Sequence, residues 1–280
     1  MALTINTNLQ SLNAQRNLAG SQGAQATAMQ RLSSGLRVNS AKDDAAGLAI
    51  AERMNAQVRG MNVAVRNAND GISLAQTAEG ALGKVGDNLQ RMRELAVQSA
   101  NGTNSITDQQ ALQKEFAQLS AEITRVAAST NFNGKSLLNN ADAITFQVGA
   151  GTTAGVDTID VNGVDVTGLT SLADKIGDDA GAALTANADV LKVIENIDKD
   201  LTTINSARAE LGAVQNRFEA VVSNLQIASE NASASRGRIM DADFAQETAN
   251  LSRAQVLQQA GMAMVAQANQ LPQNVLSLLR

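Results

Sequence analysis

The sequence contains no cysteine and no histidine. Without cysteine, the chain has neither a disulfide nor a thiolate that could act as a nucleophile or bind a metal. Without histidine, it lacks the side chain that most often transfers protons near neutral pH and most often binds transition metals. We therefore expect no enzyme activity, no cofactor and no metal site.

Large rings, prolines and positive charge are also scarce. The chain of 280 residues has no Trp, no Tyr, five Phe and a single proline, Pro272, and its net charge is -5. A core without large rings favours thin packing of helix on helix. The negative charge argues against a nucleic-acid partner, because a phosphate backbone requires a basic surface.

No charged residue occurs between Ala254 and Leu279. Gln, Asn and Ser interrupt this stretch too often for a membrane span, so we expect no membrane insertion. The opening residues, MALTINTNLQ, lack the basic and apolar regions of a cleavable signal peptide.

The uncharged C-terminal stretch carries a heptad pattern with two lines of residues. Large residues recur every seven positions on one line and mostly small residues on the other, which is typical of a coiled-coil seam. The N-terminal segment is also almost uncharged and rich in Ala, Leu, Gln and Asn, with Arg16 as the only charge before residue 31. We expect these residues to form a polymerisation seam: Ile5, Leu9, Leu12, Leu257, Met264, Leu271, Val275 and Leu278.

Helical periodicity extends over much of the remaining chain. It predicts helices over 45–99, 107–129 and 189–229, with irregular joints at 31–44 and 233–243. Thr107 and Gln110 resemble a capping box. Alternating apolar residues from Ile144 predict a strand, and Asn162-Gly163 predicts a tight hairpin between 158–161 and 164–167.

The sequence therefore predicts a mainly α fold, a long antiparallel helical bundle or coiled coil built from both termini with a small β-hairpin insert. We expect an inner coiled coil from 1–40 and 240–280. An outer helical domain is expected from 41–140 and 185–239, and a short acidic β insert at 141–184.

Long motifs at both ends resemble bacterial flagellin. The N-terminal motifs are INTNLQSLNAQRNL, RLSSGLRVNSAKDDAAGLAIAERM and NANDGISLAQTAEGAL, and the C-terminal motifs are DADFAQETANLSRAQVLQQAG and AQANQLPQNVLSLLR. The resemblance implies a structural subunit that self-assembles into the flagellar filament, secreted to the cell exterior. It also implies an export chaperone at the C-terminal region, and cap and hook-junction proteins as partners.

The resemblance further implies recognition by vertebrate flagellin-sensing receptors. The family's Toll-like receptor contacts correspond here to Gln90, Arg91, Leu95 and Glu115, which we expect to form an exposed patch. Residues 275–279 resemble the segment detected by cytosolic inflammasome receptors.

Two other functions are consistent with the pattern. One is a hook–filament junction protein, whose ends resemble those of flagellin, and the other is a coiled-coil adaptor for an unrelated helix. For assembly we expect coupled folding. Each terminal segment alone buries too little apolar surface to offset the entropy of ordering, so the ends are expected to be largely disordered in the free chain and to order in the polymer.

Overall fold

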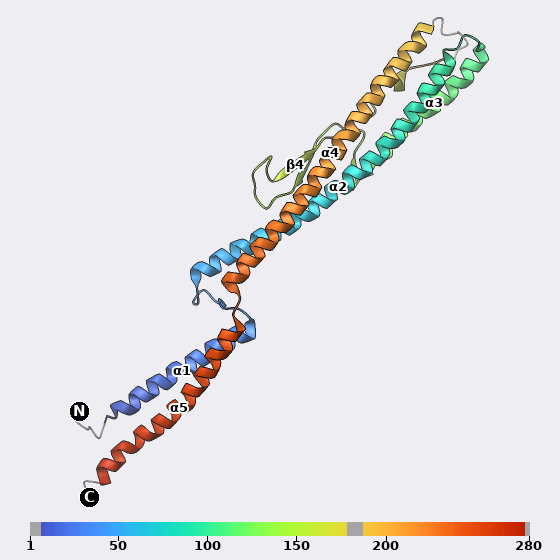
Figure 1. Ribbon diagram of the computed structural model, residues 1–280. Coiled ribbons are helices and arrows are strands. Elements are labelled where there is room, and N and C mark those ends of the chain that lie inside the picture. The colour runs from blue at the N-terminus through green and yellow to red at the C-terminus, as the bar shows by residue number, and fades with distance from the viewer. Residues whose placement is uncertain (1–6, 178–186, 278–280) are drawn as a thin grey trace. The chain divides into compact units, whose positions relative to one another are not determined.

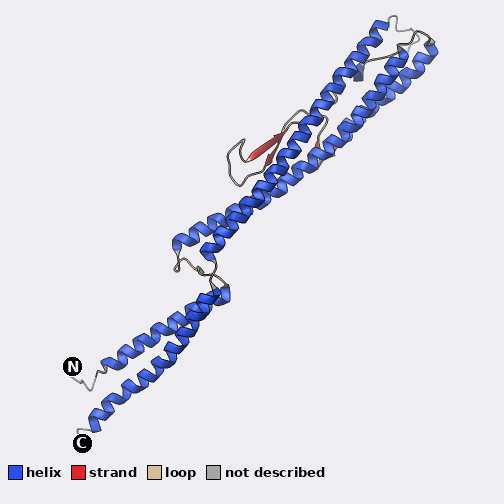
Figure 2. Cartoon of the chain, in the orientation of Figure 1, coloured by secondary structure: helices blue, strands red, loops and turns tan. Residues whose placement is uncertain are grey.

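The computed structural model describes residues 7–177 and 187–277 as a mainly helical chain (Figures 1 and 2). The helices are α1 (Leu9–Ser34), α2 (Ala45–Ser99), α3 (Ile106–Ser129), α4 (Asn187–Met240) and α5 (Phe244–Ser277). Short strands and a 3-10 turn, η1 (Thr170–Ala173), lie between α3 and α4. The predicted fold class, a mainly α protein with a small β insert, is confirmed.

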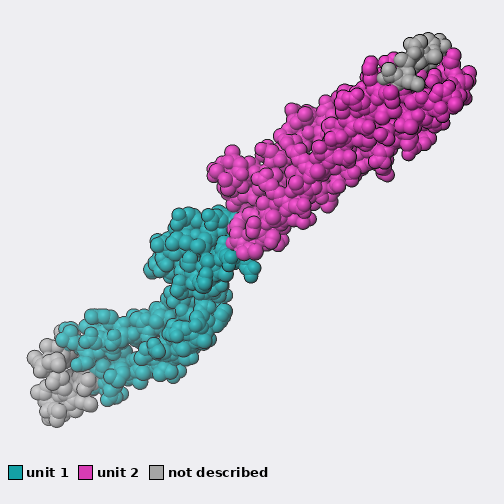
Figure 3. All heavy atoms as spheres, turned by 45° about the horizontal axis from the view of Figure 1, so that its top comes forward, with its two compact units in different colours: residues 1–58, 230–280 teal, residues 59–229 magenta. Residues whose placement is uncertain are grey.

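The chain divides into two compact units (Figure 3). Unit 1 comprises residues 1–58 and 230–280, and unit 2 comprises residues 59–229. The boundaries between them fall within α2 and within α4, and not in the coil segments near residues 40 and 240. In both units, segments far apart in the sequence are brought together.

Helix α2 covers the predicted range of 45–99. Asp44 caps it, since the Asp44 carboxylate accepts a hydrogen bond from the Gly47 amide at 2.8 Å. Within the described residues, no helix combines the length and the apolarity needed to cross a membrane.

Unit 2 has a continuous core of large side chains. Helices α2, α3 and α4 each contribute side chains with no exposed surface: Leu82, Leu89, Met92, Phe116, Ile197 and Phe218. Phe146 of strand β3 (Ile144–Gln147) packs edge-on against Phe218, with ring centroids 5.6 Å apart. Two of the five phenylalanines therefore join the β insert to the helices.

The prediction of a hairpin at Asn162-Gly163 is wrong. Strand β4 (Thr158–Val161) pairs antiparallel with β3, and Asn162 and Gly163 follow β4 without the positive φ that a type I′ turn requires. Ile159 and Val161 lie on one face of β4, belong to the unit 2 core and are each 2% exposed. The glycine is needed at 163 for another reason, because a Cβ there would collide with the carbonyl oxygen of Asn140.

The same turn chemistry occurs instead at Asn133-Gly134. These residues have φ of 50° and 80° and connect β1 (Asn131–Phe132) to β2 (Lys135–Ser136). Only glycine and asparagine adopt such values readily, so this pair forms the tight hairpin. The chain thus contains the tight Asn-Gly hairpin that was predicted, but at residues 133–134 and not at residues 162–163.

Helix ends differ from the prediction at three points. Ser105 and Asp108 form the capping box of α3, two residues before Thr107 and Gln110 respectively. Helix α1 continues to Ser34 and ends at Gly35, which has a φ of 71°. Helix α4 continues through residues 233–240, because Ser and Gly only weaken a helix that has no internal proline.

Gly71 and Gly80 of α2 offer a matched test of the packing in unit 2. A Cβ at Gly71 would lie 2.6 Å from the buried Phe218 ring, whereas a Cβ at Gly80 would have nothing within 4 Å. Gly71→Ala should lower the free energy of unfolding by about 1–3 kcal/mol, because the fully buried ring cannot move aside freely. Gly80→Ala should raise it by up to ~1 kcal/mol through helix propensity. Urea unfolding of both variants measures the two effects, and equal shifts would contradict the proposed packing.

Candidate assembly and recognition surfaces

Helices α1 and α5 of unit 1 pack side by side and antiparallel (Figure 1). Near the start of α1, the Asn8 side-chain amide donates to the Ala268 carbonyl at 2.7 Å. One turn later, the Ser11 hydroxyl donates to the Asn269 side chain at 2.8 Å. Asn8 also caps α1, because its side-chain oxygen accepts a hydrogen bond from the Ser11 amide.

Small residues form the contact between α1 and α5. Ser11 and Ala28 are the buried residues of α1, and Ala254 and Ala268 are buried on α5. Between them, Gly261 lies directly against Leu18. The small residues of the heptad pattern, Ala254, Gly261 and Ala268, therefore face α1, and the two helix backbones approach closely.

The large residues of the predicted seam point away from this contact. Leu9 is 66% exposed, Leu257 is 54% exposed and Met264 is 63% exposed, and Leu12 is exposed as well. Ile5 and Leu278 lie outside the described residues, and the side chains of Leu271 and Val275, within α5, are not described. A monomeric protein seldom leaves such a series of large apolar side chains in water, so this surface is a candidate assembly surface.

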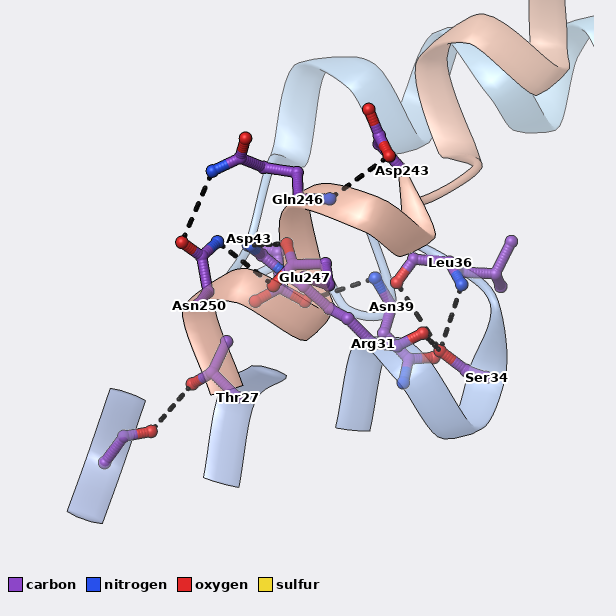
Figure 4. Close-up of polar contacts among 11 residues, drawn as sticks. Thr27, Arg31, Ser34, Leu36, Asn39, Asp43, Asp243, Gln246, Glu247 and Asn250 are labelled. Atoms are coloured by element: carbon purple, nitrogen blue, oxygen red, sulfur yellow. Dashed lines mark hydrogen bonds and ion pairs between the residues drawn. The ribbon is translucent and has the colours of Figure 1, made fainter. Parts of the chain in front are cut away.

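An ion pair connects α1 to α5 at their other end (Figure 4). Arg31 in the last turn of α1 donates to Glu247 in the first turn of α5 at 3.0 Å. The Glu247 side chain is only 9% exposed. Each charge also has the favourable sign for its helix end, which was the signal available in the sequence.

Backbone hydrogen bonds hold the joint beside this pair. The Arg37 amide donates to the Met240 carbonyl at 2.6 Å, and the Ala242 amide donates to the Gly35 carbonyl at 2.9 Å. In the loop that follows, the Asp43 carboxylate accepts hydrogen bonds from the Ser40 hydroxyl and from the Ser40 and Asn39 amides. These bonds, the Ser40 hydroxyl first, lower the pKa of the Asp43 carboxyl group. Backbone hydrogen bonds between the segment that follows α1 and the segment that precedes α5 therefore order the joint.

A second candidate surface lies on unit 2, where α2 meets α3. Arg91 donates to Glu115 of α3 at 2.8 Å and to Glu94, one turn along α2, also at 2.8 Å. The hydrogen bonds that Arg91 donates to Glu94 and then to Glu115 raise its pKa, so the guanidinium is charged at any physiological pH. Both Arg91 and Glu115 remain about half exposed, and Gln90 is exposed beside them.

Leu95 does not belong to this exposed patch. Its side chain has no exposed surface and packs in the unit 2 core with Met92 and Ala96. The expectation of an exposed Arg–Leu–Glu surface is therefore wrong for the leucine, because residue 95 lies on the helix face that turns inward. Val97, at 50% exposed, is the apolar residue of this part of α2 that faces water.

Within residues 7–177 and 187–277, no group of three acidic side chains is placed to hold a metal ion. The ordered polar chemistry of both surfaces consists of helix caps, ion pairs and amide contacts. Such an arrangement can bind other proteins.

Two family models match the chain. Residues 5–143 match the bacterial flagellin N-terminal helical region, and residues 194–279 match the bacterial flagellin C-terminal helical region. The matched ranges include all of α1, α2, α3 and α5 and most of α4, and leave out most of the β insert.

Relatives of similar length match from end to end. A flagellin from Halalkalibacterium halodurans is 48% identical over 280 residues, covering 99% of this chain and all of the relative. A flagellin from Bacillus subtilis is 42% identical over 308 residues, again covering 99% of this chain and all of the relative.

The fold also resembles a solved structure. A putative flagellar hook-associated protein from Vibrio parahaemolyticus superposes with a TM-score of 0.61 at 17% identity, covering 71% of this chain and all of that chain. At this identity the likeness concerns the fold alone.

The Arg31–Glu247 pair leads to a prediction for the joint. Arg31→Met should leave the nearly buried Glu247 carboxylate without its partner and lower the local stability of the joint by about 1–3 kcal/mol. In the assembled chain, where α1 and α5 are paired, amide hydrogen exchange in the last two turns of α1 should then become about tenfold faster or more. Arg16→Met removes the other, exposed arginine of α1 and should leave exchange in those turns unchanged. Equal exchange in the two variants would contradict a stabilising role for the pair.

Proposed function

The chain belongs to the bacterial flagellin family and is a structural subunit of the flagellar filament, and we propose that it enters the filament through its α1–α5 pair. The role is structural and requires no catalysis. The observation that carries the proposal is the exposure of large apolar residues along both helices, while the residues between the helices are small.

Apolar burial supplies the free energy of assembly in this proposal. Each exposed Leu or Met contributes roughly 1.5–3 kcal/mol when it is fully buried. Six such side chains, Leu9, Leu12, Met29, Leu257, Met262 and Met264, are exposed on the described part of the pair. Their burial between copies offsets the entropy lost when the ends become ordered, so ordering and assembly are coupled. The free chain keeps its ends largely disordered, and the paired helices are the conformation of the assembled subunit.

The proposed roles of the segments follow from this coupling. Residues 1–40 and 240–280 form the inner tube, residues 41–140 and 185–239 form an outer shell, and residues 141–184 form a short surface insert. The large core of unit 2 supports an independently folded shell segment. The poor core of the α1–α5 pair supports an inner segment that depends on neighbouring copies.

Export and partner binding complete the proposal. The chain is exported to the cell exterior, and a dedicated chaperone covers the apolar surface of the C-terminal region before assembly. Cap and hook-junction proteins meet the subunit at the two ends of the filament. Exposed, uncharged α5 side chains support a chaperone site of this kind, because they would otherwise aggregate before export.

The alternatives predict different assemblies. A hook–filament junction protein would occupy one short zone of the filament, and a coiled-coil adaptor would stay small at any concentration. Full-length relatives of 42–48% identity that carry the name flagellin favour the filament subunit. Electron microscopy and sedimentation of the purified chain under polymerising conditions distinguish the three.

Removal of residues 241–280 tests the assembly surface directly. The cut follows the last residue of α4, Met240, so the core of unit 2 remains intact. The truncated chain should unfold cooperatively and stay monomeric at concentrations where the full chain forms filaments, because α1 loses its partner. Sedimentation velocity and electron microscopy measure assembly, and circular dichroism checks the fold. Filaments formed by the truncated chain would refute assembly through the α1–α5 pair.

We further propose that the free subunit is a ligand of vertebrate flagellin-sensing receptors. The supporting observation is the Arg91 guanidinium, half exposed and held in a fixed direction by Glu94 and Glu115. A pre-positioned arginine is a common anchor of protein interfaces, because little entropy is lost when it binds. Gln90 is exposed beside Arg91 and can contact a receptor. Leu95 is buried, so it contributes by packing in the core beneath the surface and not by contact. The C-terminal residues 275–279 are proposed to serve the cytosolic receptors.

A reporter-cell assay for the Toll-like receptor tests this second role. Arg91→Ala should reduce the potency of the monomer by about tenfold or more, since a hot-spot residue contributes roughly 1.4 kcal/mol or more. Arg125→Ala is the matched control, because Arg125 is an exposed α3 arginine paired with Glu122 in the same way. The role is refuted by a parent chain without activity, or by equal potency of the parent and both variants.

A further inference from the structure

Three Asn-Gly pairs occur in the chain, at residues 101–102, 133–134 and 162–163. An asparagine followed by glycine can lose its side-chain amide without an enzyme, because glycine has no side chain to shield its backbone nitrogen. The pairs share this local chemistry, but the fold gives each one different surroundings. The relative rates of the reaction at these sites therefore depend on the fold and not on the dipeptide.

Asn101 lies in the exposed connection between α2 and α3. Its side-chain carbonyl oxygen accepts a hydrogen bond from the Thr103 amide at 3.3 Å. This bond closes a ring that contains the side-chain carbonyl carbon of Asn101 and the Gly102 nitrogen, so the side chain is folded back toward that nitrogen. Within the described part of the chain, no hydrogen bond occupies the Gly102 amide or the side-chain nitrogen of Asn101.

We propose that Asn101 is a deamidation site, at which the asparagine becomes aspartate or isoaspartate. The Gly102 nitrogen loses its proton to a hydroxide ion and attacks the side-chain carbonyl carbon of Asn101. A C–N bond forms, the bond to the side-chain nitrogen breaks, and ammonia leaves with a proton from water. Water then opens the cyclic imide at either carbonyl, so no oxidant is required. The Thr103 amide stabilises the negative charge that develops on the carbonyl oxygen during the attack.

The other two pairs are protected by their surroundings. Asn133 and Gly134 form the turn between the paired strands β1 and β2, with φ of 50° and 80°. Closing the imide ring requires rotation about the Cα–C bond of Asn133, which the strand pairing on both sides resists. Asn162 is held by its side chain instead, whose nitrogen donates to the Glu210 carboxylate of α4 at 2.7 Å. That bond must break before ammonia can leave.

Deamidation at residue 101 changes the end of α2. The product carries a negative charge two residues after Ser99, where the carbonyl end of the helix already has a partial negative charge. The buried hydroxyl of Ser99 also holds the neighbouring segment, because it donates to the Ile176 carbonyl at 2.8 Å. The reaction should therefore loosen the last turn of α2 and its contact with Ile176.

Mass spectrometry of peptides from the purified full chain measures conversion at each pair during incubation in mildly alkaline buffer. We expect Asn101 to convert first and Asn162 last, with rates that differ by about tenfold or more, since a hydrogen bond protects the Asn162 amide. In urea, the unfolded chain should convert all of the pairs at similar rates, because they share the same dipeptide. Equal rates in the folded chain, or an Asn101 that does not convert, would overturn the proposal.

Two variants of Glu210 isolate the protection of Asn162. Glu210→Ala removes the acceptor and should accelerate conversion at Asn162 by about three- to tenfold. Glu210→Gln keeps an acceptor oxygen and should leave Asn162 nearly as slow as in the parent chain. Neither variant should change the rate at Asn101, and circular dichroism verifies that both fold. An unchanged rate at Asn162 in Glu210→Ala, or equal acceleration at both sites, contradicts protection by the fold.

Asn101→Asp reproduces the charge of the deamidated chain and tests the effect on α2. Amide hydrogen exchange in the last turn of α2 should become about two- to fivefold faster, since an added negative charge weakens the carbonyl end of a helix to this extent. Asn133→Asp adds the same charge in the turn between β1 and β2 and should leave that exchange unchanged. Equal exchange in the two variants would contradict the loosening of α2.

Discussion

The close contact of small residues between α1 and α5 is the constraint on which the rest of the structure depends. Ser11, Ala28, Ala254 and Ala268 bring the two helices together, and Gly261 admits the Leu18 side chain. Such a contact is tight but removes little apolar surface from water, so it stabilises the pair weakly. The side chains that could stabilise it strongly point outward, which is why we propose that the pair depends on neighbouring copies for its stability.

Unit 2 shows the opposite arrangement, with large side chains inside and polar residues outside. Phe218 lies over Gly71 and against Phe146, so one ring fixes the distance between α4, α2 and the β insert. A glycine-rich α2 is stable here because its neighbours pack against it and compensate for its low helix propensity. One chain therefore combines a self-sufficient segment with a dependent one, and the difference is set by where large residues point.

Helical periodicity was enough to predict α2 over 45–99, because apolar residues that alternate steps of three and four over a long stretch share one face only in an α-helix. Local sequence could not show in the same way which of the Asn-Gly pairs forms a tight hairpin. Asn133-Gly134 and Asn162-Gly163 have the same local preference, and only the burial of Ile159 and Val161 against the helices selects between them. For Leu95 the signal was present, since Met92, Leu95 and Ser99 share one helix face, but a transferred motif does not say which face is buried.

The scarcity of charge on the terminal helices fits surfaces that neighbouring copies are proposed to cover. A charge on such a surface loses its hydration when it is covered, so it is costly unless an opposite charge lies beside it. The Arg31–Glu247 pair solves this within a single chain, and it lies at the joint end of the helices. Along the rest of α1 and α5, Gln and Asn serve instead. An amide both donates and accepts hydrogen bonds, so a surface of amides can satisfy an identical surface, which neither lysine nor glutamate alone can do.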